Sequence, residues 1–215
     1  MNLNLSQVIP HPLKEADDIS ASEVWNKSSL SITTPERILI SAPSGKGKST
    51  LLNILYGVRK DYDGILSMNE QSMTNASEEI WNKRRKEDLS MVFQGLELFD
   101  HLTALENVNL KNEITSYKSE LEISNMFDLL GIQKLKDQKT KTLSFGQKQR
   151  VAIIRSLCQP YKWLLLDEPF SHLDSLNSKI ALDLIIEESD KLNAGIILTS
   201  LDSIETTIFT KSLTL

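Results

Sequence analysis

A short loop rich in glycine, lysine and hydroxyl residues carries the clearest chemistry in this sequence. Residues 41–50 read SAPSGKGKST, which matches the phosphate-loop pattern G-x-x-x-x-G-K-S/T except that Ala42 replaces the first glycine. Glycines let consecutive backbone N–H groups point into one concavity, and a following helix adds its positive end. We expect Lys48 to reach the phosphates and Ser49 to hold Mg²⁺, within a binding segment made of Ser44, Gly45, Lys46, Gly47, Lys48, Ser49 and Thr50.

The competing interpretation of this loop is a glycine- and serine-rich turn before an ordinary helix. The context argues against it, because an apolar strand-like run (37–41) precedes the loop and a segment of helical spacing follows Lys48. Ala42 would cost about 1 kcal/mol if its position needed left-handed backbone geometry, and almost nothing otherwise.

An acidic pair ends a second apolar run, LLLDEP at 164–169. Asp167, at the carboxyl end of a strand, is placed to hold Mg²⁺ beside Ser49, and Glu168 to polarise an attacking water. An isolated acidic pair at a strand end is usually only solvated. The phosphate loop in the same chain favours the functional interpretation.

The segment LSFGQKQR at 143–150 identifies a family. It should open a helix whose N-terminus and Ser144 hydroxyl can bind a phosphate, although alone it would be an ordinary helix N-cap. With the other motifs in order, the chain resembles the ABC ATPases from about residue 3 to its end. Their signature reads L-S-G-G-Q, so Phe145 stands in place of its first glycine.

The resemblance implies an ATP hydrolase that uses ATP and Mg²⁺. In its terms, Gln94 of MVFQ is the Q-loop glutamine, which contacts Mg²⁺ or the attacking water. Glu168 and Gln94 are the implied catalytic residues. The implied Mg²⁺ ligands are Ser49, Gln94 and Asp167.

The resemblance also implies partners. ABC ATPases form head-to-tail dimers in which each ATP lies between the phosphate loop of one chain and the signature of the other. The implied second half-site here is Ser144, Gly146, Gln147 and Asp174, the last from SHLD at 171–174. We therefore expect a homodimer or heterodimer, docked on an integral membrane permease through an apolar groove near Gln94 and residues 95–108.

Three residues depart from the family pattern. Leu201 stands where a switch histidine usually contacts the γ-phosphate, and losing such a donor typically costs about 100-fold or more in rate. Trp25 is the only tryptophan, tyrosine or phenylalanine before Tyr56 and therefore the candidate to stack adenine, but it is equally compatible with a buried core position. Phe145 could protrude toward a second chain or fold back.

Alternating strands and helices must position these motifs. Continuous apolar strands at 37–41, 163–167 and 195–200 predict a parallel sheet buried on both faces, and strand-like segments near the start predict a small antiparallel layer. The middle of the chain is mostly helical, with Gly131 as a helix C-cap. We predict an α/β P-loop NTPase fold with a RecA-like parallel core, an N-terminal antiparallel β-layer and an inserted α-helical subdomain. It forms one ABC ATPase domain over residues 1–215, with its core at about 1–95 and 160–215 and the helical subdomain at about 96–159.

Composition excludes several classes of protein. The chain has 215 residues and a net charge of −5, which disfavours a nucleic-acid partner held by bulk electrostatics. One cysteine, Cys158, allows no intrachain disulfide, and no apolar run approaches the roughly 20 residues of a membrane span. The N-terminus lacks the features of a signal peptide. We therefore expect a cytoplasmic chain, peripheral on the inner face of the cell membrane.

Other functions compete with that of a transporter subunit. A regulatory or mechanical ATP-binding module would act on a membrane protein without transport, and Leu201 favours it slightly. DNA-repair or ribosome-associated ABC ATPases need a long coiled coil or tandem domains, which this sequence lacks. A small-molecule kinase is disfavoured by the signature segment.

Overall fold

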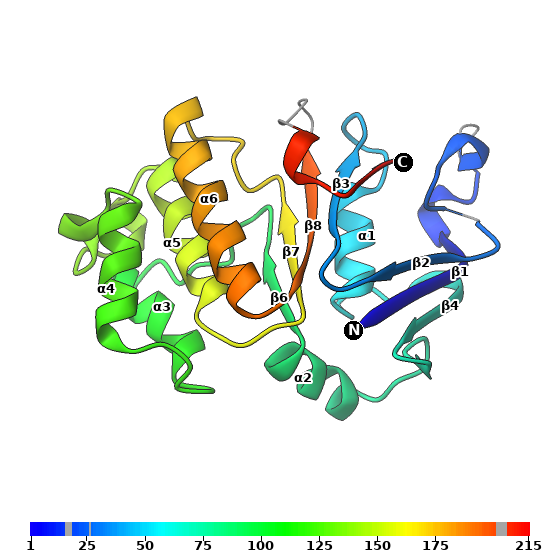
Figure 1. The fold of residues 1–215 in the computed structure, drawn as a ribbon, viewed down its shortest axis with the longest axis horizontal. Helices are drawn as coiled ribbons and strands as arrows, with labels where there is room; N and C mark the ends of the chain where they lie inside the picture. Colours follow the sequence, from blue (N-terminus) through cyan, green and yellow to red (C-terminus); the bar gives the residue numbers. More distant parts are fainter. Residues whose placement is uncertain (16–18, 26, 201–205) are drawn as a thin grey trace.

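Two β-sheets and a group of helices lie side by side along the longest axis of the molecule (Figure 1). The computed structural model describes residues 1–15, 19–25, 27–200 and 206–215. An antiparallel sheet, a parallel sheet and a helical layer follow one another, with α1 (Lys48–Leu55) between the two sheets. This arrangement confirms the predicted α/β fold class. The division into a core at about 1–95 and 160–215 and a helical subdomain at about 96–159 stays a proposal.

The antiparallel sheet has the strand order β2-β1-β4-β5. Its strands are β1 (Asn2–Pro10), β2 (Leu30–Thr33), β4 (Tyr62–Met68) and β5 (Gln71–Ser72). The pairing of β1 with β4 shifts register between Ser6 and Ile9, and Gln7 has a φ of 52°. This irregularity precedes the short helix η1 (His11–Leu13), which lies against the phosphate loop.

The parallel sheet has the strand order β6-β7-β8-β3-β9. Its strands are β6 (Leu89–Val92), β7 (Trp163–Asp167), β8 (Gly195–Ser200), β3 (Arg37–Ser41) and β9 (Lys211–Thr214). The three apolar runs predicted as strands are confirmed as β3, β7 and β8. Because these strands are parallel, Ser41 and Asp167 end at the same edge, with β8 between their strands.

Helices α2 to α6 begin at side-chain caps. Ser77, Thr103, Ser119, Ser144 and Asp174 each accept a hydrogen bond from the main chain of the first turn, and three of them form capping boxes. The helices they open are α2 (Glu78–Glu87), α3 (Ala104–Asn112), α4 (Glu120–Leu129), α5 (Phe145–Leu157) and α6 (Ser175–Lys191). Shorter helices are η2 (Ile19–Ala21), η3 (Gln133–Leu135), η4 (Thr140–Thr142) and η5 (Thr206–Ile208). Gly131, at a φ of 65°, follows the end of α4 as predicted.

The two faces of the parallel sheet belong to two separate hydrophobic cores. Successive residues of a strand point to opposite faces, so Leu39 packs with α3 to α6 while Ile38 and Ile40 pack with α1 and the antiparallel sheet. Removing one of these buried side chains typically costs about 2–5 kcal/mol. The edge that carries the phosphate loop is therefore fixed from both sides. Cys158 is fully buried in the helical core, and burial raises the pKa of its thiol to about 12.

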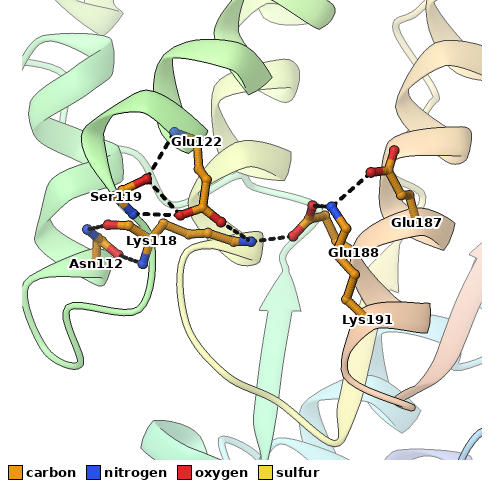
Figure 2. Close-up of polar contacts among 7 residues, drawn as sticks. All are labelled: Asn112, Lys118, Ser119, Glu122, Glu187, Glu188 and Lys191. Atoms are coloured by element: carbon orange, nitrogen blue, oxygen red, sulfur yellow. Dashed lines mark hydrogen bonds and ion pairs between the residues drawn. The ribbon is translucent and has the colours of Figure 1, made fainter.

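A buried ion pair joins the connection between α3 and α4 to α6 (Figure 2). The Nζ atom of Lys118 lies 2.6 Å from Glu188 Oε2 and 3.2 Å from Glu122 Oε1, and Lys191 bonds the other oxygen of Glu188 at 2.6 Å. Asn112 holds the main chain of Lys118 through two hydrogen bonds of 2.8 Å. These contacts fix the helical layer to the helix that follows β7.

Candidate functional site: a phosphate loop beside an acidic pair

The phosphate loop connects the carboxyl end of β3 to the first turn of α1. Gly45 and Gly47 have φ values of +80° and +97°, which a side chain would disfavour. Ala42 is nearly buried and has no positive φ, so the alanine at this position adds no backbone strain. A Cβ atom on Gly47 would lie only 2.8 Å from the Leu13 side chain. Glycine is therefore required where the loop meets the antiparallel layer.

Lys48 lies under the loop and is 5% exposed. Its ammonium donates to the carbonyl oxygens of Ala42 at 2.6 Å and Pro43 at 3.2 Å, and it lies 3.3 Å from Glu168 Oε1. The predicted phosphate-binding cation and the predicted water-polarising carboxylate are thus direct neighbours.

The acidic pair is held by the neighbouring strand β8. Asp167 is 2% exposed, and its Oδ1 accepts a hydrogen bond of 2.9 Å from the Thr199 hydroxyl. Burial raises the pKa of Asp167, and hydrogen bonds from Ser49 and Thr199 oppose that rise. Glu168 has a φ of 47°, the left-handed region that residues with side chains seldom adopt.

Three oxygen-bearing side chains converge beside the loop. The Ser49 hydroxyl donates to Gln94 Oε1 at 3.3 Å, and it lies close enough to the Asp167 carboxylate to lower the pKa of that group. A hydroxyl, an amide oxygen and a carboxylate form an all-oxygen set, which fits Mg²⁺. Within the part of the chain that the structure describes, no three His, Cys, Asp or Glu side chains gather as a metal site. The residues present therefore fit a hard cation that keeps several of its waters.

A pocket of about 360 Å³ opens over the loop. Its polar wall contains the predicted residues Ser44, Gly45, Gly47, Lys48, Ser49, Thr50, Gln94 and Glu168. It is also lined by Pro10, Pro12, Leu13 and Arg59, which the sequence did not identify. The Arg59 guanidinium lies 3.3 Å from Thr50 Oγ1 and binds both oxygens of Asp61. The volume and the mixture of polar groups with the apolar side chains of Pro10, Pro12 and Leu13 suit a ligand with a phosphate chain and a less polar end.

Trp25 lies beneath the loop rather than in this pocket. It is 2% exposed, belongs to the core shared by α1 and the antiparallel sheet, and would lie 3.2 Å from a Cβ on Gly47. Its indole Nε1 is buried without a hydrogen-bond partner. Trp25 is thus a buried core residue. It also lines a second cavity, of about 260 Å³, together with Leu13 and the loop residues Ser44, Gly45 and Lys46.

The signature segment forms the first turn of α5. Ser144 Oγ accepts from the Gln147 N–H at 3.3 Å, and Gln147 Oε1 accepts from the Ser144 N–H at 2.9 Å. The Phe145 ring packs on His172 at a centroid distance of 4.2 Å and is 45% exposed. A Cβ on Gly146 would lie 2.7 Å from the His172 carbonyl oxygen, so glycine is required there.

Asp174 caps α6 in this structure. Its Oδ1 accepts from the Asn177 N–H at 2.8 Å, and this bond is the main reason that the pKa of Asp174 is lowered. None of Ser144, Gly146, Gln147 and Asp174 lines the pocket over the loop. Leu201, the predicted replacement of the switch histidine, lies outside the described residues.

Some site residues were beyond the reach of sequence patterns. Pro10 and Pro12 reach the pocket because β1 is irregular and ends in η1, and Arg59 because the chain turns directly after α1. The only signals were two prolines after a strand and a basic residue after the helix that begins at Lys48. Thr199, inside an apolar strand, gave no signal.

Sequence similarity to known proteins extends over most of the chain. Residues 25–171 match the family model described as ABC transporter. The chain is 33% identical over 189 residues to the lipoprotein-releasing system ATP-binding protein LolD of Legionella pneumophila (strain Lens), an alignment that covers 86% of this chain and 83% of that protein.

Similarity to solved structures extends further. The dimeric structure of MJ0796, a bacterial ABC transporter cassette, matches with a TM-score of 0.76 and 27% identity over 92% of this chain and 87% of that one. A dimeric structure of MJ0796 in a post-hydrolysis state, bound to ADP and Pi, matches with a TM-score of 0.75 and 25% identity over 93% and 88%. These matches confirm the expected P-loop NTPase fold.

Proposed function

The chain belongs to the ABC transporter ATP-binding family and is an ABC-type ATPase, and from this premise we propose that it closes as a dimer on ATP and drives a separate membrane permease. The convergence of Lys48, Ser49 and Glu168 on one pocket, with the buried Asp167 carboxylate next to Ser49, supports this function most directly. The permeases of lipoprotein-releasing systems are the first candidates, because LolD is the similar ATP-binding protein described above.

The pocket residues have different roles in ATP binding and hydrolysis. Lys48 and the main chain of the loop bind the phosphates, and Ser49, Gln94 and Asp167 would hold Mg²⁺, which supplies positive charge to the phosphate oxygens. Glu168 orients the attacking water and accepts its proton as the water oxygen bonds to the γ-phosphorus, while the bond from that phosphorus to the bridging oxygen breaks and ADP leaves. The adenine base of ATP lies toward Pro12 and Leu13 rather than on Trp25.

The signature turn serves the nucleotide of a second subunit in this proposal. Ser144, Gly146, Gln147 and Asp174 lie apart from the pocket of their own chain, and MJ0796 is described as a dimeric cassette. The half-exposed Phe145 ring is then part of the contact between subunits. The second subunit is a copy of this chain or a related ATPase subunit.

Turnover is slow in this proposal, because Leu201 cannot donate a hydrogen bond to the γ-phosphate. A preorganised donor of this kind is worth about 100-fold or more in rate. Glu168 remains in place, so hydrolysis continues at a reduced rate.

A groove of about 250 Å³ near the Q-loop is the proposed dock for the permease. Phe99 and Leu110 give it exposed apolar surface, and Glu97, Lys111 and Arg155 border it. Burial, together with neighbouring arginines, lowers the pKa of Lys111 to about 8. An acidic side chain on the permease would stabilise the charged form of Lys111 and raise its pKa again. Within the predicted docking segment 95–108, Leu96 is buried, Leu98 and Leu102 are half-buried and Phe99 is exposed.

The chain acts on the inner face of the cell membrane in this proposal. No helix among the described residues has the length and apolar character needed to cross a membrane.

The second candidate is a regulatory or mechanical module, which Leu201 favours because slow hydrolysis suits a long-lived ATP-bound state. A transport assay separates the two, with the chain and its membrane partner reconstituted in vesicles and wild type compared with Glu168→Gln. If the chain is a transporter subunit, the variant should stop transport, and its rate of ATP hydrolysis should fall at least about 100-fold. The regulatory or mechanical module is supported instead by two results together. The wild type moves no substrate, and the membrane partner still responds to ATP when Glu168 is replaced by glutamine.

A further inference from the structure

The main chain of Glu168 is held from both ends by side chains of two different elements. Its φ of 47° is disfavoured for a residue with a side chain, so the neighbouring structure must stabilise it. The Glu168 N–H donates to Thr199 Oγ1 at 3.1 Å, and its carbonyl oxygen accepts from Gln149 Nε2 at 3.2 Å. Both partners are almost fully buried.

Thr199 connects the two acidic residues through one hydroxyl group. It lies opposite Asp167 in the pairing of β7 with β8 and is 0% exposed. Its hydroxyl accepts from the Glu168 N–H and donates to Asp167 Oδ1 at 2.9 Å. Valine has the same shape and would suit an apolar strand, and a buried hydroxyl is costly unless it is bonded. A third, longer contact joins the hydroxyl to the Leu166 carbonyl oxygen at 3.4 Å, so the two shorter bonds to the acidic pair are its main interactions.

Gln149 connects Glu168 to the signature helix. It lies one turn after Ser144 in α5 and is 1% exposed. Its amide nitrogen donates to the Glu168 carbonyl, and its amide oxygen accepts from the His172 N–H at 3.3 Å. Both the nitrogen and the oxygen of the Gln149 amide thus bind the segment between β7 and α6. A displacement of α5 would be transmitted to Glu168 through this amide.

We propose that Thr199 and Gln149 are positioning residues for hydrolysis, which together clamp the Glu168 backbone in its left-handed conformation. This inference deepens the proposed function and rests on the roles given there to Glu168 and Asp167. Thr199 positions both carboxylates, whereas Gln149 positions Glu168 alone. The two residues therefore differ in what their loss changes.

The test uses the purified full chain with matched substitutions. Three quantities are measured: kcat and KM for ATP hydrolysis, the Mg²⁺ concentration at half-maximal binding of a fluorescent ATP analogue, and the thermal unfolding midpoint. Thr199→Val should lower kcat by about 10- to 100-fold, since small displacements of a catalytic group are this costly. It should also raise the Mg²⁺ midpoint about tenfold through Asp167. Thr199→Ser should restore both values to within about threefold of wild type, because it keeps the hydroxyl.

Gln149→Leu provides the second arm. It should lower kcat by about tenfold or more and leave KM and the Mg²⁺ midpoint within about twofold, because Gln149 has no bond to Asp167. Thr140→Val is the matched control, since Thr140 is also fully buried and donates to a main-chain carbonyl at 2.8 Å. It should lower the unfolding midpoint without changing kcat or the Mg²⁺ midpoint.

The clamp is refuted if Thr199→Val and Gln149→Leu, each measured while folded, change only the unfolding midpoint. It is also refuted if Thr199→Ser behaves like Thr199→Val. Wild type without measurable hydrolysis would instead contradict the ATPase itself, and the Mg²⁺ midpoints of the same variants would still decide the role of Thr199. Thr199→Ala replaces Thr199→Val if the latter does not fold.

Discussion

The ammonium of Lys48 and the carboxylate of Glu168 are 3.3 Å apart. Lys48 is 5% exposed and its other hydrogen bonds go to two carbonyl oxygens of the loop, so Glu168 is its anionic neighbour. A phosphate in the loop would compete with Glu168 for this ammonium. Phosphate binding and the freedom of the carboxylate proposed to polarise water are therefore coupled through one lysine.

Substitution of Lys48 should weaken ATP binding. Lys48→Met keeps a similar apolar length but lacks the charge, so the dissociation constant for ATP should rise at least about tenfold, the scale of one lost charge-assisted hydrogen bond. Isothermal titration measures it. Lys46→Met is the control in the same loop, where the main chain provides the expected contact, and it should change the constant less than about threefold. Equal losses in both variants would contradict the role of the Lys48 side chain.

Restoring a hydrogen-bond donor at position 201 should raise turnover. Leu201→His supplies the imidazole that the family pattern contains, and kcat should increase about tenfold or more because a preorganised donor stabilises the transition state. Leu201→Ala removes the same leucine without adding a donor and should leave kcat near the wild-type value. Steady-state phosphate release provides the measurement. Wild-type turnover already equal to that of Leu201→His would show that the leucine does not limit the rate.

The parts of this fold that sequence predicts are those with a local cause. Continuous apolar runs predict β3, β7 and β8 because a parallel sheet is buried on both faces. The phosphate loop follows from its glycines and from the strand and helix around it. The pocket wall at Pro12 and Arg59 depends on the irregularity in β1 and the turn after α1, which no local pattern specifies. The partners of Thr199 depend on strand register, which a single strand does not reveal.

Trp25 should prove dispensable for nucleotide binding. Trp25→Phe removes a buried N–H that has no partner, which offsets part of the cost of the lost ring volume, so the net change should be within about 2 kcal/mol. The affinity for ATP should stay within about threefold, because Trp25 is 2% exposed and does not line the 360 Å³ pocket that contains Lys48 and Ser49. Leu13→Ala, at a residue that does line it, should weaken binding more. A tenfold loss of ATP affinity in Trp25→Phe but not in Leu13→Ala would instead indicate that the Trp25 indole stacks on adenine.

Breaking the buried ion pair should destabilise the helical layer. Lys118→Met leaves Glu188 buried with only Lys191, and such a loss typically costs about 3–5 kcal/mol (Figure 2). Lys118→Met combined with Glu188→Gln should cost less than Lys118→Met alone, since no charge is then left uncompensated. Urea denaturation of both variants measures this difference. Additive losses would show that Lys118 and Glu188 do not act as a pair.

Stability should also fall in acid through Glu122. Hydrogen bonds from Ser119, with a further contribution from Lys118, lower the pKa of Glu122 to about 2. A carboxylate whose folded pKa is lowered stabilises the fold above its unfolded pKa of about 4.3, and this contribution is lost as the pH falls toward 2. Because its side chain is half exposed, we expect the effect to be on the order of 1 kcal/mol. The unfolding free energies of wild type and Glu122→Gln should therefore converge as the pH is lowered from about 5 to about 2.5. This range starts above the unfolded pKa of about 4.3 and ends close to the folded pKa of about 2. Curves that stay parallel over this range would show that Glu122 contributes nothing to the acid sensitivity of the fold.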